Sequence, residues 1–366
     1  MRYLNEESIE KIALGAAVLG TGGGGDPYIG KLMAKEAIRK YGPVRLISLE
    51  ELENDQLVVP VSGMGAPTVT IEKIPAENEV TAPLEALEKV LGRKVDVVMP
   101  IEIGGINSLY PIIAAAKKEL PILDADSMGR AFPEAQMVTF HLDGFEPSPV
   151  TMADEKGNTV VIYPKDGVWS ERLARALTIE MGGSASVCDY SLFGSDIKTT
   201  VIPYTLTLAE KIGEYLLDNK GKEHLGIQKM LEELKGYRLF EGKIADIERH
   251  LSGGFTRGSA RFEGIRNDQG REFTLFFQNE HLVAKEGEQL LCSTPDLIAV
   301  LDAETGFPIT TERMKYGARV LVVAFPCHEK WRTLKGIETA GPRYFGYDFD
   351  YRSVEELQKE GERCID

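Results

Sequence analysis

Apolar residues recur three and four positions apart near the start of the chain and fall on one face of a helix. This pattern predicts a helix over 6–19, which should end where a run of glycines begins. A second helix is expected over 29–41, and Gly42 and Pro43 should end it. The chain therefore opens with two helices joined by a glycine-rich turn.

Short apolar runs then alternate with helical patterns as far as residue 123. Such alternation is typical of an α/β domain with a partly parallel sheet. The predicted strands are 44–49, 57–63, 95–100 and 121–123, and the predicted helices are 84–91 and 108–120.

The pattern changes over 137–163 to short alternating segments with turns, which predicts an antiparallel addition to the sheet. A helix over 170–181 and a strand over 185–190 follow, and later a last helix over 354–361 could pack on either half. Successive strands dominate the second half of the chain. They are expected at 239–247, 255–262, 272–278, 282–285, 297–301 and 318–324, after helices at 204–218 and 227–235.

The length of 366 residues exceeds the size at which single hydrophobic cores stop growing, so two domains are expected. We predict an α+β (mixed α/β) fold. An N-terminal α/β domain with a partly parallel mixed sheet should occupy 1–167, and a β-rich C-terminal domain should occupy 168–366.

A formal net charge of −15 argues against nucleic acid and membrane surfaces as partners, because both need clustered basic residues. No apolar run approaches the roughly 20 residues of a membrane-spanning helix. The first eleven residues carry charges where a signal peptide needs an apolar core, so a cytoplasmic location is predicted. The cysteines at 188, 292, 327 and 364 have neither disulfide-framework nor zinc-finger spacing.

The glycine run is the first candidate for a binding site. Consecutive glycines can adopt positive φ and expose backbone N–H groups, and the following helix N-terminus adds partial positive charge. The run lacks the Lys-Ser/Thr pair of a nucleotide-binding P-loop and follows a helix rather than a strand. An unusually tight turn between helices is the alternative. The residues predicted to contact a substrate are Gly22, Gly23, Gly24, Gly25 and Asp26.

Polar residues also follow the predicted strands, at the edge of an α/β sheet where ligands gather. Glu102 is a candidate catalytic carboxylate and Asn107 a candidate substrate ligand, although asparagine there could simply cap a helix.

The densest polar cluster runs from Asp124 to Glu134. Asp124 and Asp126 are candidate catalytic residues that could share a metal, hold a proton or orient water. Arg130 could clamp a substrate carboxylate, and Glu134 joins it as a substrate-binding candidate. Alternatively, Asp126 caps a helix and Arg130 pairs with a neighbouring acid.

Single residues add weaker candidates. Cys188 could be a nucleophile in a cleft between domains, although a free cysteine is more often a small buried apolar residue. The histidines lack metal-ligand spacing, and His141 is expected alone on an alternating strand. Arg257 and Asp296 could face the cleft and are second-tier candidates, because tight strand turns also explain both.

Five segments together resemble the S-methyl-thiohydantoin desulfurase family, whose genes often lie beside hydantoinase/oxoprolinase subunits. They are Leu19–Pro27, Glu102–Asn107, Asp124–Glu134, Gly253–Phe255 and Pro295–Ile298. The resemblance implies a two-domain α+β enzyme that hydrolytically replaces sulfur by oxygen on a five-membered thiohydantoin or related cyclic amide.

The resemblance also suggests roles for the candidates. Asp124 or Asp126 would activate water, glycine amides or Asn107 would hold ring heteroatoms, and Arg130 would bind an acidic substituent, with a covalent route through Cys188 left open.

No cofactor is expected for such an enzyme, and a divalent metal is left open. The expected partner is a small-molecule substrate, and a homo-oligomer or a hydantoinase/oxoprolinase-like partner is also considered. Two alternatives are kept: a non-catalytic accessory or ligand-binding subunit of such a system, and a metal-dependent cyclic amidohydrolase.

Overall fold

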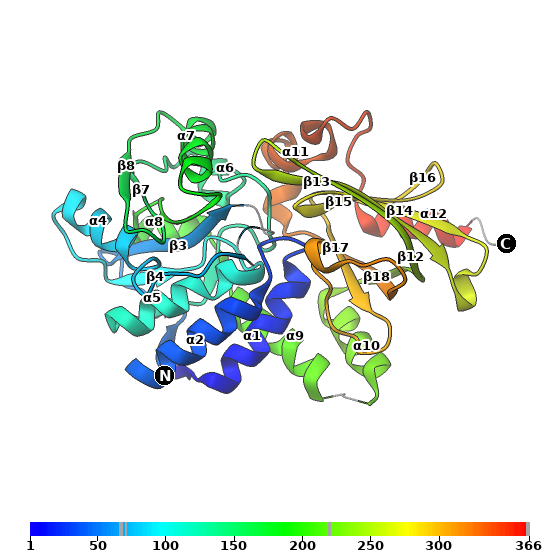
Figure 1. Cartoon of the computed structure of the whole chain (residues 1–366), viewed down its shortest axis with the longest axis horizontal. Helices are drawn as coiled ribbons and strands as arrows, with labels where there is room; N and C mark the ends of the chain where they lie inside the picture. Colours follow the sequence, from blue (N-terminus) through cyan, green and yellow to red (C-terminus); the bar gives the residue numbers. More distant parts are fainter. Residues whose placement is uncertain (66–68, 70–71, 219–220, 364–366) are drawn as a thin grey trace.

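The structure is a computed structural model that describes residues 1–65, 69, 72–218 and 221–363. It contains two large sheets with helices around them, and the second sheet is formed by the later part of the chain (Figure 1). This is the predicted α+β architecture.

The first sheet is mixed. Across the described residues its strands follow the order β1-β2-β5-β4-β3-β9-β7-β8, and β10 pairs with β3. The pairs β2/β5, β5/β4 and β4/β3 are parallel and the others antiparallel, so the prediction of a partly parallel sheet is confirmed. The strands are β1 Arg2–Leu4, β2 Val44–Ile47, β3 Leu57–Gly65, β4 Val97–Met99, β5 Ile122–Leu123, β7 Val150–Ala153, β8 Thr159–Ile162, β9 Ser184–Cys188 and β10 Leu192–Phe193.

Helices α1, α2, α5 and α9 group together beside this sheet (Figure 1). Helices α1 and α9 pack closely because each presents a glycine to the other: a Cβ on Gly15 would lie 1.9 Å from the Ala209 carbonyl oxygen, and one on Gly213 equally near Lys11. The helices are α1 Glu6–Leu19, α2 Pro27–Tyr41, α4 Ala82–Leu91, α5 Tyr110–Lys118, α7 Gly167–Glu180 and α9 Thr205–Asp218. Each of these six helices matches a predicted one within a few residues at its ends.

The second sheet is antiparallel, in the order β16-β15-β14-β13-β12-β18-β17 over the part of the chain described. Strands β15 and β17 also contact each other, so the sheet curls around a core that includes Phe240, Phe262 and Phe273. The strands are β12 Tyr237–Ser252, β13 Phe255–Gly264, β14 Glu272–Gln278, β15 Glu280–Glu286, β16 Gln289–Ser293, β17 Leu297–Asp302 and β18 Arg319–Phe325.

Two further helices lie in the second half of the chain. Helix α10 (Glu223–Leu234) packs on α9, and the last helix, α12 (Val354–Arg363), lies against β16 of the second sheet. The Gln358 side chain donates to the Leu291 carbonyl oxygen at 3.0 Å, which settles that α12 belongs with the second sheet.

Some expectations need correction. The segment 137–163 begins with a short helix, α6 (Thr139–Leu142), so His141 lies on a helix and not on a strand; only β7 and β8 form the expected antiparallel hairpin. The pattern missed β16 and several short elements: the pair β6 (Ala125–Asp126) and β11 (Ile202–Pro203), and the helices α8 (Gly194–Thr200) and α11 (Leu334–Ala340). Such segments are too short to show a period.

The predicted boundary at residue 167 stays a prediction. The first sheet takes β9 and β10 from beyond it, so the two halves of the chain share this sheet and its helices.

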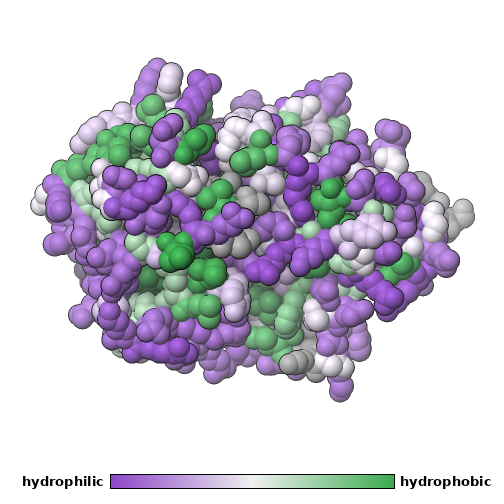
Figure 2. All heavy atoms as spheres, in the orientation of Figure 1, coloured by the Kyte–Doolittle hydropathy of each residue, from purple (hydrophilic) through white to green (hydrophobic). Residues whose placement is uncertain are grey.

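The face in Figure 2 is predominantly hydrophilic, with apolar side chains in scattered patches. Over the described residues no helix combines the length and apolar character that crossing a membrane requires.

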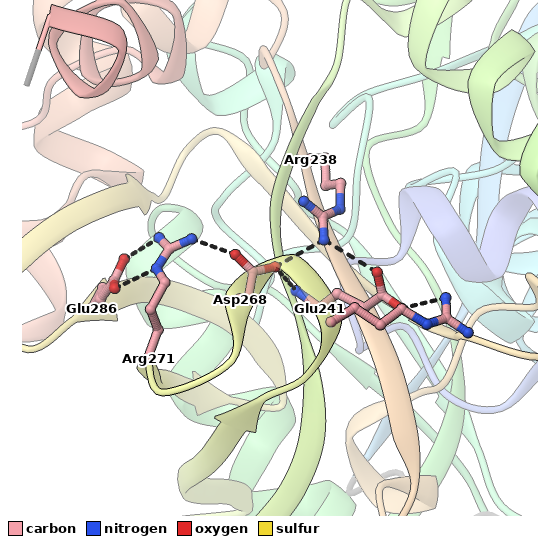
Figure 3. A network of polar contacts seen from close by, with 6 residues as sticks. Arg238, Glu241, Asp268, Arg271 and Glu286 are labelled. Atoms are coloured by element: carbon pink, nitrogen blue, oxygen red, sulfur yellow. Dashed lines mark hydrogen bonds and ion pairs between the residues drawn. The ribbon is translucent and has the colours of Figure 1, made fainter. Parts of the chain in front are cut away.

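A buried aspartate, Asp268, organises the turn between β13 and β14 in the second sheet (Figure 3). Asp268 accepts a hydrogen bond from the Arg238 guanidinium and one from the Glu241 backbone N–H, both at 2.8 Å, and also pairs with Arg271. Replacing Asp268 with asparagine should lower the free energy of unfolding by about 1–3 kcal/mol, because two arginines and the Glu241 N–H lose a buried, charged acceptor.

Urea denaturation of D268N measures this loss. Glu286→Gln removes the other, more exposed carboxylate of Arg271 and serves as the control, which should cost less than about 1 kcal/mol. Equal losses in the two variants would show that the burial of Asp268 has no special energetic role.

Candidate active site

A cavity of about 110 Å³ lies between the edge of the first sheet and the start of β15. A single water needs roughly 10–15 Å³ of comparable space, so there is room for a small ring. The lining includes groups from both halves of the chain. They are Gly24, Gly25, Ser62, Gly63, Met64, Gly65, Glu79, Ile101, Glu102, Ile106, Asn107, Tyr110, Met128, Phe132, Pro133, Glu134, Ala135, Arg175, Ser184, Ala185, Val187, Asp189, Asn279 and Glu280.

The glycine turn forms one wall of this cavity through Gly24 and Gly25. Positive φ angles of 70° and 78° at these positions explain why glycine is used there. The turn is held to the second sheet, since the Gly24 N–H donates to Glu280 Oε1 at 3.1 Å. A Cβ on Gly23 would lie 1.9 Å from that same oxygen, so only glycine permits the approach.

The other residues of the turn do not line the cavity. Gly22 packs against His281, where a Cβ would lie 2.2 Å from Nε2. Asp26 accepts the Tyr28 N–H at 2.9 Å as the cap of α2, and it pairs with Arg313. This cap explains why α2 starts at Pro27 rather than at Ile29.

Glu102 and Asn107 lie together in the cavity wall, at the positions that follow β4. Asn107 Nδ2 donates to Glu102 Oε1 at 2.6 Å, and Asn107 also exchanges hydrogen bonds with the Gly63 backbone. The second Glu102 oxygen accepts the Phe132 N–H at 3.3 Å. Asn107 therefore orients the Glu102 carboxyl, and the helix-cap alternative is not what the contacts show.

Glu102 and Glu280 are electrostatically coupled across the cavity. Burial and the nearby Glu280 hold the pKa of Glu102 well above its usual range. Burial also raises the pKa of Glu280, to about 7, while the Gly24 N–H and two arginines favour its ionised form. Both carboxyl groups are therefore harder to ionise than an exposed glutamate, and Glu280, with a pKa of about 7, is close to its titration midpoint at neutral pH.

Asp189 adds a third buried carboxyl group to the lining. Burial raises its pKa to about 7, and its Oδ1 has no hydrogen-bond partner in the described part of the protein. Its neighbour Cys188 is fully buried in β9 and is not a lining residue; burial raises the pKa of its thiol well above the usual value. Such a thiol packs as a small apolar group.

Asp124 and Asp126 bind protein groups outside the cavity. Asp124 accepts the Thr207 N–H at 3.0 Å and also accepts a hydrogen bond from the Thr207 hydroxyl, at the start of α9. One Asp126 oxygen accepts three backbone N–H groups, from residues 103, 128 and 129, at 2.8–3.1 Å. Their predicted activation of water stays a prediction, and our proposal below assigns that role elsewhere.

Arg130 is fully buried and holds the two halves of the chain together. It donates to the carbonyl oxygens of Pro295 and Asp296, both at 2.7 Å, and to the Thr21 hydroxyl at 2.9 Å. The guanidinium is thus occupied by protein acceptors and does not line the cavity. Glu134 does line it, and one of its oxygens accepts from Gln136 and Tyr344, each at 2.6 Å.

The remaining candidates lie away from the cavity. Asp296 is buried and accepts the backbone N–H groups of Cys327 and Val354, which anchors the C-terminal segment. Arg257 is on β13, near the ring of Phe255. Cys292 and Cys327 are buried and free, and Cys364 lies outside the described residues.

Sequence reasoning missed Glu280 as a site residue. The available sequence signal was the polar run 278–281 between two apolar strands. In the structure Asn279 has a positive φ of 56° at the tight turn between β14 and β15. Arg175 and Glu79 were missed as well, because each lies on a segment without a distinctive motif.

No metal site emerges from these contacts. Over residues 1–65, 69, 72–218 and 221–363, no three or more His, Cys, Asp or Glu side chains are grouped so that they could hold a metal ion.

Fold and cavity together define a two-domain α+β protein with a buried carboxyl-rich pocket between its halves. The chain belongs to the S-Me-THD-like family: the model of the N-terminal domain matches residues 7–164, and that of the C-terminal domain matches residues 165–354. The family resemblance seen in the sequence is confirmed.

One solved structure supports the fold. A crystal structure of a protein from Chromobacterium violaceum is 23% identical to the chain, with a TM-score of 0.81, and the match covers 97% of this chain and 100% of that one. No curated protein matches significantly.

Proposed function

We propose that this chain is a hydrolase that converts an S-methyl-thiohydantoin to a hydantoin and releases methanethiol. The family supports this substrate class, and one observation of the site carries the chemistry. Two buried carboxyl groups, Glu102 and Glu280, share one cavity, and burial raises the pKa of both. Carboxyl groups whose pKa values are raised toward the working pH are suited to general acid–base catalysis.

In the proposed reaction, ionised Glu280 takes a proton from water while the water oxygen bonds to the ring carbon that carries sulfur. Protonated Glu102, oriented by Asn107, then gives its proton to the departing sulfur as the C–S bond breaks. The ring nitrogen of the former C=N bond takes up a proton from solvent, and the second water proton leaves to solvent as the new carbonyl group of the hydantoin forms. Transfer of the Glu280 proton through solvent to Glu102 then restores both carboxyl groups.

The direct test incubates the purified chain with hydantoins, thiohydantoins and their S-methyl derivatives and follows free thiol and ring opening. Thiol release from an S-methyl derivative, without ring opening, is the expected result. If no compound reacts and none shifts the melting temperature, the proposal is wrong. If the chain by itself turns over no compound and co-purifies with a hydantoinase-like protein, the accessory-subunit alternative is favoured.

Replacing Cys188 with alanine should leave kcat/KM within about threefold of the wild type. The thiol is buried outside the cavity and holds its proton, so it is poorly suited to attack a substrate. The assay for released thiol measures this, with Cys292→Ala as a control for the loss of a buried thiol elsewhere. A decrease of more than 100-fold in C188A alone would support a covalent route.

A further inference from the structure

Acidic side chains dominate the cavity. Five carboxyl groups line it, from Glu79, Glu102, Glu134, Asp189 and Glu280. Among the described lining residues, Arg175 is the only one with a basic side chain.

Arg175 does not neutralise this charge, because it is already paired. Its Nε donates to Glu171 Oε1 at 2.7 Å, and its Nη2 donates to the Pro133 carbonyl oxygen at 3.1 Å. Arg130, the other arginine that favours ionised Glu280, is engaged by protein acceptors as described above. Among the described lining residues, a single cation that already pairs with Glu171 therefore faces five carboxyl groups.

Two of the carboxyl groups also have open hydrogen-bonding positions. Glu280 Oε2 and Asp189 Oδ1 are buried without a hydrogen-bond partner in the described structure, and the two residues are 3% and 5% exposed. Buried polar atoms are rarely left unpaired, because desolvation without a hydrogen bond is costly. A ligand that brings N–H donors would satisfy both oxygens.

We infer that the cavity selects five-membered rings that carry a positively charged amidinium group over neutral rings of the same shape. An amidinium supplies the missing charge and directs planar N–H donors outward, as carboxylates prefer. Its ligands would then include cyclic guanidines. Where it concerns substrates, the inference rests on the proposed function, since an S-methyl-thiohydantoin gains this charge when its ring nitrogen is protonated during reaction.

The inference predicts the opposite charge preference to the sequence-based expectation that Arg130 receives an acidic substituent. Rings bearing a carboxylate should be disfavoured, because like charges would meet in a site of low dielectric. The acidic lining, rather than any single residue, sets this preference.

Equilibrium binding of two unreactive rings tests the inference without relying on turnover. The first is 2-aminoimidazoline, a cyclic guanidine that is protonated at neutral pH, and the second is imidazolidin-2-one, a neutral ring of the same size. The wild type should bind the cation at least about tenfold more tightly, as expected for charged hydrogen bonds.

Glu280→Gln and Asp189→Asn should each reduce this ratio about fivefold or more, while Glu263→Gln, which removes an exposed carboxylate on β13, should preserve it. Near-ultraviolet circular dichroism identifies any variant that does not fold. If one of the two cavity variants does not fold, the binding ratio of the other tests the inference. Equal or tighter binding of the neutral ring, or an unchanged ratio in the folded cavity variants, would overturn the inference. A preserved preference without any thiol release would instead refute only the proposed reaction.

Discussion

Replacing Glu280 with glutamine should lower kcat/KM for thiol release by about 10²- to 10⁴-fold, the usual contribution of a general base. Glutamine keeps the size of the side chain and can still accept from the Gly24 N–H, so the glycine turn should stay in place. It cannot take a proton from water. Steady-state assays of wild type and E280Q measure the loss.

The pH profile gives a sharper result. Since Glu280 must be ionised and its pKa is about 7, kcat/KM of the wild type should rise as the pH increases through about 7. At higher pH the rate should fall once Glu102, whose pKa is also raised, loses its proton. E280Q should lose the rising limb, and Glu263→Gln should retain it. An unchanged rising limb in E280Q would show that another group is the base.

The same substitution, E280Q, should lower activity but raise thermal stability. This difference separates a catalytic defect from misfolding. The pKa of Glu280 is higher in the folded chain than the roughly 4.3 of an unfolded glutamate. Ionising it therefore costs stability as the pH rises from about 4 to above 7. E280Q lacks this cost, so its melting temperature should rise relative to wild type between pH 5 and pH 8.

The sequence predicted those elements whose signals are local. Helix α1 shows apolar periodicity, and its N-terminus is marked by Asn5, which accepts the Ser8 N–H at 3.0 Å. Most strands of the second sheet were visible because alternating or continuous apolar residues are bounded by turn residues. Segments such as α6, with four residues, are shorter than any detectable period.

The site could be predicted only in part. Glu102, Asn107 and the glycine turn follow predicted strands or helices, so their closeness to one another could be anticipated from the sheet. Glu280 could not, because its contact with Gly24 joins positions 256 residues apart. The prominent aspartates at 124 and 126 illustrate the opposite problem: carboxylates after a strand also serve to satisfy backbone N–H groups, and sequence does not distinguish the two uses.

Replacing Arg130 with methionine should destabilise the fold by about 3–5 kcal/mol. Methionine has a similar length but no donors, so the Pro295 and Asp296 carbonyl oxygens would be left buried without their hydrogen bonds. The stacking of the guanidinium on Phe132, at 4.4 Å from the ring centre, would also be lost. Each unpaired buried acceptor costs about 1–3 kcal/mol.

Urea denaturation of R130M measures this effect, and Arg343→Met is the matched control because its partners are exposed aspartates; it should shift the midpoint little. Arg130→Lys should fall between the two, since lysine restores the charge but not the forked geometry that reaches three segments at once. Arg130 contacts residues 21, 295 and 296, so its loss should also weaken the hold between the glycine turn and the second half of the chain. A midpoint for R130M equal to that of R343M would show that Arg130 is not the tie between the halves, and the position of Glu280 beside Gly24 would then need another explanation.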